Sequence, residues 1–117
     1  MRGVYIVVLF LFSALFLSCS NNHPPLDPNQ PFPSKNAVVP TDVNFAWVCT
    51  DPDGDPLTYD LYLDKVRVAT GLTHPSYTMK LSPGTTYTWW VVAKDTSGET
   101  TPGPVWKFTT NSLSSAD

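Results

Sequence analysis

The residues best suited to do chemistry are three carboxylates on alternate positions of the segment Asp51-Pro-Asp-Gly-Asp-Pro56. Proline and glycine at this density predict a turn, where the side chains of Asp51, Asp53 and Asp55 can converge on a hard cation. The segment differs from an EF-hand loop, because its glycine comes too early and no distal glutamate follows. We therefore favour a solvated loop and keep a calcium site at these three aspartates as the alternative.

A second candidate for chemistry is Cys19, which ends an apolar stretch near the N-terminus. Met1-Arg2 is basic, and residues 4–17 are apolar apart from one serine. The stretch is shorter than the ~20 residues of a membrane-spanning helix but suits the hydrophobic part of a signal peptide. Its end, Leu15-Phe-Leu-Ser-Cys19, resembles the lipobox of bacterial lipoproteins, although Phe16 stands where that family usually has an aliphatic residue.

The lipobox resemblance implies a signal peptide of residues 1–18 and a lipid-modified Cys19 at the start of the mature chain. Two or more acyl chains are enough to hold a protein stably on a membrane. Ser20, rather than an aspartate, follows the cysteine, which in the enterobacterial sorting system implies the outer membrane. We therefore expect a lipid-anchored protein of the bacterial cell envelope, at the outer membrane. A secretory signal cleaved elsewhere and a short N-terminal anchor are the alternatives.

Other chemical functions find little support in the sequence. It lacks the Gly-x-Ser-x-Gly and His-Glu-x-x-His motifs and any glycine-rich phosphate loop. Cys49 lies on the inward side of a predicted strand, and we interpret it as a small buried residue rather than a nucleophile. The net charge is −3 with few, scattered basic residues, which argues against nucleic acid as a partner. We predict that the protein is not an enzyme and carries no cofactor.

Composition divides the chain after the signal peptide into three parts. Residues 19–34 are polar and contain five prolines, which predicts an extended tether, because proline cannot join a strand ladder and extends its predecessor. A folded domain is predicted for residues 35–110, lifted off the lipid by the tether, and residues 31–39 can serve as its first, edge strand. Residues 111–117 are a polar tail.

The domain is predicted to be all-β, because no sustained helical period follows residue 18. Alternating apolar residues predict further strands over residues 43–49, 58–64, 66–70, 76–80, 88–94 and 105–110. With residues 31–39, these make seven strands. The side chains predicted to point inward and build the structure are Trp47, Tyr87, Trp89 and Trp106.

The turn before the strand at 88–94 indicates which all-β fold this is. Leu81-Ser-Pro-Gly-Thr-Thr-Tyr87 resembles the corner of fibronectin type III domains in which a tyrosine hydroxyl bonds back to upstream backbone. Tyr87 takes that place, with Leu81 as its apolar partner. Residues 43–49 resemble the strand that carries the central tryptophan of those domains, here Trp47. The resemblance covers residues 31–110 and implies a seven-stranded, immunoglobulin-like (fibronectin type III) β-sandwich.

Trp90 is the main binding candidate, because it points to solvent if Trp89 points inward. Alternation places Tyr62, Val92, Val105 and Lys107 around it on the outer face of the sheet. An exposed aromatic patch of this kind marks a partner or ligand surface. The alternative is a surface tryptophan covered by a lysine stem or by the tether.

Three functions follow from these inferences. The preferred one is a membrane-anchored envelope lipoprotein that displays a fibronectin type III-like module for protein–protein interaction or assembly. The second is a carbohydrate-binding module at the cell envelope that uses Trp90 and Tyr62, because aromatic faces suit sugar rings. The third is a structural subunit of a larger envelope complex. The expected partners are the lipid membrane, through acylated Cys19, and a protein or a glycan.

Overall fold

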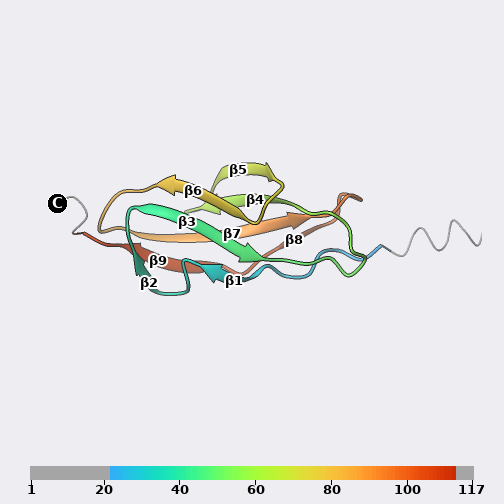
Figure 1. Ribbon diagram of the computed structural model, residues 1–117, viewed down its shortest axis with the longest axis horizontal. Coiled ribbons are helices and arrows are strands. Elements are labelled where there is room, and N and C mark those ends of the chain that lie inside the picture. Colours follow the sequence, from blue (N-terminus) through green and yellow to red (C-terminus); the bar gives the residue numbers. More distant parts are fainter. Residues whose placement is uncertain (1–21, 113–117) are drawn as a thin grey trace, which may run out of the picture.

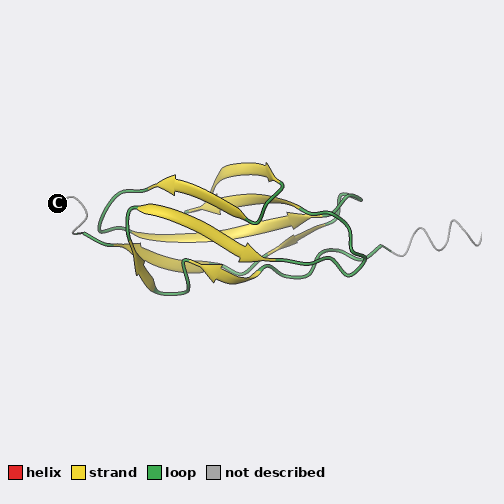
Figure 2. Ribbon diagram, viewed as in Figure 1, coloured by secondary structure: helices red, strands yellow, loops and turns green. Residues whose placement is uncertain are grey.

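The computed structural model describes residues 22–112, so the predicted signal peptide, Cys19 and residues 113–117 lie outside the described part. All regular structure in the described range is β-strand (Figure 2). Among these residues, no helix is long and apolar enough to cross a membrane.

The strands form two stacked antiparallel sheets with one parallel pair at an edge (Figure 1). The smaller sheet has the order β1 (Asn29–Phe32), β3 (Asp42–Val48), β6 (Ser76–Lys80). The larger sheet has the order β2 (Ala37–Val39), β9 (Trp106–Thr110), β7 (Thr86–Lys94), β4 (Thr58–Leu63), β5 (Val66–Leu72), and β8 (Thr100–Pro102) also pairs with β7.

The core lies between the two sheets and is built from the inward side of each strand. Burial alternates along β3, β4 and β7, as expected for strands with one face packed and one face outside. Trp89 of β7 is at the centre, with its ring 5.0 Å from Phe45 and 4.8 Å from Trp106. Trp47 packs edge-on against Tyr59 at 5.3 Å. Large aromatic side chains therefore contact one another across the sandwich, with aliphatic side chains between them.

The predicted corner is present at the start of β7. The backbone N–H of Ser82 donates a hydrogen bond of 3.1 Å to the hydroxyl of Tyr87, five residues later. Gly84 has a φ of 60°, the left-handed conformation that a glycine adopts at no steric cost. The turn is also bonded to β9, because the backbone N–H of Thr85 donates to the Thr110 hydroxyl.

The all-β sandwich is confirmed, and its strand plan differs from the prediction in two places. Residues 31–39 do not form one edge strand: β1 pairs with β3 of the smaller sheet, and β2 pairs with β9 of the larger. Pro31 and Pro33 offer no N–H, which helps to end the first pairing and lets the chain cross between sheets. Beyond the hairpin at residues 95–99, the short β8 pairs with β7. Residues 22–112 thus contain nine strands instead of seven.

The proline-rich segment is packed on the sandwich from Asn22 onward, where an extended tether is expected from the sequence. The N–H of Leu26 donates to the carbonyl of Thr50 at 3.0 Å, and the hydroxyl of Thr101 donates to the carbonyl of Pro25 at 2.6 Å. Pro28 is fully buried. Proline composition indicates that a segment makes few ladder bonds, but it does not exclude apolar packing of the rings. The folded domain therefore begins before residue 35.

Candidate functional site

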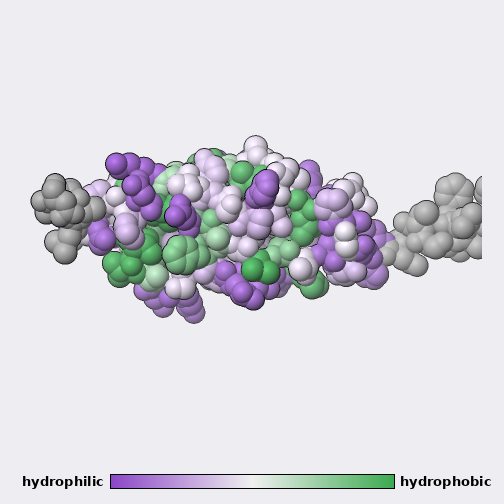
Figure 3. All heavy atoms as spheres, in the orientation of Figure 1, coloured by the Kyte–Doolittle hydropathy of each residue, from purple (hydrophilic) through white to green (hydrophobic). Residues whose placement is uncertain are grey.

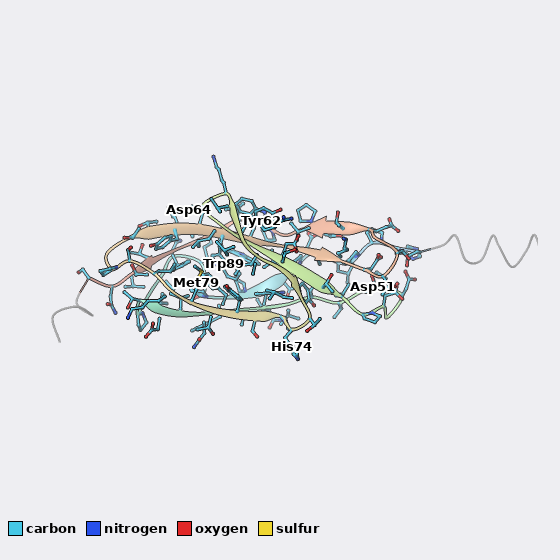
Figure 4. The ribbon with its side chains drawn as sticks, turned by 90° about the horizontal axis from the view of Figure 1, so that it is seen from above. Asp51, Tyr62, Asp64, His74, Met79 and Trp89 are labelled. Atoms are coloured by element: carbon cyan, nitrogen blue, oxygen red, sulfur yellow. The ribbon has the colours of Figure 1, made fainter. Side chains whose placement is uncertain are left out.

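The aromatic pair of Tyr62 and Trp90 lies on the outer face of the larger sheet. The two residues are directly opposite each other on β4 and β7. Their ring centroids are 5.0 Å apart and their planes differ by 3°, which is an offset parallel stack. Figure 4 shows Tyr62 toward the outside of the sheet, with Trp89 deeper in the molecule. Each ring covers one face of the other, so both side chains are half-buried.

The pair is the middle of a row of side chains that crosses β5, β4 and β7 and ends just before β9, here called the aromatic row: Arg67, Tyr62, Trp90 and Val105. Arg67 on β5 is opposite Tyr62. Val105 directly precedes Trp106, which is opposite Trp89, so the antiparallel register continues the row at Val105. Val105 is 61% exposed. Val105 was expected near Trp90 from the sequence, whereas Arg67 was not, because its position depends on the register of β5 against β4.

The two other binding candidates, Val92 and Lys107, flank the row. Val92 is half-buried and lies opposite Asp60 and Pro102. Lys107 is exposed and lies opposite Thr88, so it is diagonal to Trp90 across β7 and β9. The structure therefore places all four candidate residues on one face and brings two of them, Tyr62 and Trp90, into ring contact.

The carboxylates beside the aromatic row are already engaged within the sheet. Asp60 accepts hydrogen bonds from the Thr70 hydroxyl at 2.8 Å and the Gly71 N–H at 3.0 Å. Its other oxygen lies 3.7 Å from the Arg67 guanidinium. Asp64 accepts a bond of 2.8 Å from the N–H of Thr88. These aspartates brace β4 against its neighbours, and they have less capacity to contact a partner.

The three aspartates of the turn, Asp51, Asp53 and Asp55, do not converge on one point. Oxygens of Asp51 and Asp55 lie within 4.8 Å of each other and of Asp95, which comes from the hairpin between β7 and β8. Asp53 instead accepts a bond of 2.7 Å from the N–H of His23 and lies 3.2 Å from its ring nitrogen. The calcium interpretation thus remains a prediction, and its three positions are only partly brought together.

Asp95 is the most buried acid of this cluster, being 4% exposed. The side-chain amide of Asn22 and the N–H groups of Glu99 and Ser97 donate to its carboxylate and lower its pKa. In contrast, burial raises the pKa of the Asp55 carboxyl, and the nearby charge of Asp51 adds to this. The hairpin composition Asp95-Thr-Ser-Gly-Glu99 is a turn signal, but its approach to Asp51 is a tertiary contact that the sequence does not reveal.

Cys49 is half-buried, and its thiol donates a hydrogen bond of 3.2 Å to the carbonyl of Leu26. Burial raises the pKa of the thiol to about 11, and the charges of Asp27 and Asp51 act in the same direction. The thiol therefore stays protonated at neutral pH, which suits the packing role expected from the sequence.

No family model matches this chain, and no curated protein does. Solved structures are similar in fold. The PKD domain of an M14-like peptidase from a Thermoplasmatales archaeon has a TM-score of 0.57 and 25% identity, covering 77% of this chain and 98% of that one. The fibronectin type III domain of human fibronectin type III domain containing protein 3 has a TM-score of 0.57 and 24% identity, covering 79% and 91%.

A third similar structure is that of the fibronectin(III)-like modules of Clostridium thermocellum CbhA, with a TM-score of 0.57 and 18% identity, covering 70% of this chain and 94% of that one. These likenesses establish the fold: an immunoglobulin-like sandwich of the fibronectin type III and PKD kind. Sandwiches of this kind serve many functions, so function has to be argued from the surface.

Proposed function

We propose that this protein is a membrane-anchored lipoprotein of the bacterial cell envelope that displays its sandwich domain for protein–protein contact. The outer face of the larger sheet is the contact surface, and the aromatic row is its centre. The domain acts by binding rather than by catalysis, without a cofactor and without nucleic acid. The observation that carries the proposal is the stack of Tyr62 on Trp90 beside Arg67, because tyrosine, tryptophan and arginine dominate the binding energy of protein interfaces.

The geometry of the stack favours a protein over a flat sugar ring as the partner. A sugar ring packs on the face of an aromatic ring, and a platform needs aromatic faces that lie side by side. Here the ring planes of Tyr62 and Trp90 differ by only 3° and their centroids are 5.0 Å apart. One face of each ring is therefore covered by the other ring. The pair offers ring edges and outer faces, which fit the apolar groove of a protein surface.

The anchor rests on the sequence at Cys19, which lies outside the described residues. The basic start, the apolar stretch and the serine before the cysteine support a lipid on this residue, and Ser20 supports the outer membrane as the destination. A lipid anchor places the domain at the envelope, where a binding surface meets other envelope proteins.

A glycan is the second candidate partner, because Trp90 is only half-buried and the strand register gives it the exposed Val105 and Lys107 as neighbours. This alternative predicts that a soluble polysaccharide changes tryptophan fluorescence and that Trp90→Ala abolishes the change. If the proposed protein–protein contact is permanent, the protein is a structural subunit of a larger complex, and the aromatic row is always buried in the interface.

The first test is the mass of the protein purified from its native membrane in mild detergent. We expect an assembly larger than the monomer, which Trp90→Ala shifts toward the monomer. Val48→Ala is the matched control, because Val48 is an exposed apolar residue on the other sheet. A lipid-modified monomer in the wild type would contradict a stable interface and direct the search to glycans. Equal losses with both variants would contradict the role of the aromatic row.

A further inference from the structure

One end of the sandwich holds the first described residues, and we call it the N-terminal pole. It consists of residues 22–28, the loop at residues 49–57 and the hairpin at residues 95–99. The side-chain amide of Asn22 donates bonds of 2.8 Å to both Asp95 and Glu99. The N–H of His23 donates to Asp53 at 2.7 Å. The chain is therefore tied to both loops at the point where the described part begins (Figure 1).

The following residues are attached to the body of the domain as well. The N–H of Leu26 is bonded to Thr50, and the carbonyl of Pro25 to Thr101. Pro28 packs so closely on Gly103 that a Cβ there would come within 3.1 Å of the proline ring and of the Val91 carbonyl oxygen. Residues 22–28 therefore form part of the domain and cannot serve as a swinging spacer.

Covalent geometry then limits how far the domain can be from its lipid anchor. Only residues 20 and 21 lie between Cys19 and Asn22. Three Cα–Cα steps span at most about 11 Å, whatever their conformation. We infer that the N-terminal pole lies at the lipid surface and that the sandwich stands on the membrane by this pole. The inference rests on the proposed lipid at Cys19.

This placement specifies where a partner must be. Along β7, Trp90 is five residues from Asp95 of the pole, which is about 17 Å at the rise of a β-strand. The strands run from the pole to the opposite end, so the outer face of the larger sheet is directed sideways, along the membrane. The partner is therefore a protein on the same membrane surface, whose binding site lies about 17–28 Å above the lipid.

The negative charge of the N-terminal pole is consistent with a domain that is held at the membrane by its lipid anchor alone. The pole contains six acidic residues and has neither lysine nor arginine; the acids are Asp27, Asp51, Asp53, Asp55, Asp95 and Glu99. Figure 3 shows hydrophilic residues at this end of the molecule. Anionic headgroups attract basic segments, so this acidic pole does not adsorb by itself and depends on the lipid at Cys19.

The test uses the full lipid-modified chain in phosphatidylcholine vesicles that contain a lipid with a nitroxide on its headgroup, a short-range quencher. A maleimide fluorophore is attached at Ser97→Cys, at the pole, or at Ser82→Cys, in the turn at the opposite end. Labelling at pH 7 spares Cys49, whose pKa is raised to about 11. We expect a strong loss of fluorescence at position 97 and almost none at position 82.

A matched control inserts a flexible glycine–serine segment between Asn21 and Asn22 and leaves the domain unchanged. The fluorescence loss at position 97 should then fall to that at position 82. Equal quenching of both labels in the original chain would mean that the sandwich lies flat, and quenching at neither would mean that the pole stands away from the lipid; each result overturns the inference. Failure of the proposed anchor is recognised separately, from the mass of the protein. A mass without lipid would overturn the anchor at Cys19 and, with it, the inferred orientation.

Discussion

Trp89 and Trp90 are neighbours on β7, and they belong to two very different regions of the molecule. Trp89 is 0% exposed and its ring meets Phe45, Trp47 and Trp106 between the sheets. Trp90, on the outer face, has the ring of Tyr62 as its aromatic contact among the described residues. The same residue type thus has several aromatic neighbours on one side of the sheet and one on the other.

The difference separates folding from binding within a single strand. Partners from both sheets surround Trp89, so its burial contributes to the stability of the sandwich. Only one sheet holds Trp90, which leaves part of its surface for a partner at little cost to the fold. If the binding surface used core residues, a substitution there would weaken binding and folding together. Here the two properties can be changed independently, because different side chains carry them.

The largest effect should come from the inner face. Trp89→Ala should lower the free energy of unfolding by about 3–5 kcal/mol, because it leaves a cavity among aromatic rings that cannot close it. The indole N–H of Trp89 has no hydrogen-bond partner in the described part, so the loss is one of packing. Chemical denaturation measures it, with Trp90→Ala as the control on the same strand. Similar losses in both variants would contradict the comparison.

The outer face should show a smaller effect on stability. Trp90→Ala should cost about 1 kcal/mol, because the lost stack is partly exposed. A double-mutant cycle with Tyr62→Ala isolates the pair, and we expect a coupling energy of about 0.5–1.5 kcal/mol. A coupling near zero would show that the two rings do not stabilise each other in solution.

This inner and outer pattern could be predicted from the sequence because it follows from a period of two. Val43, Phe45 and Trp47 alternate with polar or small residues, and the structure buries these three side chains. The turn before Tyr87 carries its own signal in Pro83 and Gly84. Both features are local, so one sequence is enough to place them.

The features that sequence reasoning missed are tertiary. The contact of Asn22 with Asp95 joins residues 73 positions apart, and no local pattern announces it. The approach of Asp95 to Asp51 is of the same kind. Likewise, the prolines of residues 22–33 predict a lack of ladder bonds, but burial of Pro28 against Gly103 depends on a space that only the folded sandwich provides.

Tyr87 tests the boundary between the two regions, because it is half-buried and stacks on Phe108 at 5.7 Å. Tyr87→Phe keeps the ring and removes only the acceptor of the Ser82 N–H bond. We expect a loss of about 0.5–1 kcal/mol, the net value of one hydrogen bond at a site that water can reach. The denaturation midpoint reports it, and an unchanged midpoint would show that the corner is held by the ring alone.

The smallest change concerns the thiol at the edge of the inner face. Cys49 has a pKa raised to about 11 by burial, so the protonated form is favoured in the folded state and thiolate appears only as the pH rises. A shift of the pKa from 9.0 to about 11 leaves the thiolate fraction at pH 7 about 100-fold below that of an unshifted thiol. The rate of reaction of Cys49 with a disulfide reagent should therefore rise about tenfold per pH unit from 7 to 10.

The control is an exposed thiol at Ser97→Cys, whose reaction rate should instead level off near pH 9. A plateau near pH 9 for Cys49 as well would mean that Leu26 and its segment do not cover the thiol in solution, and would place this end of β3 with the exposed region.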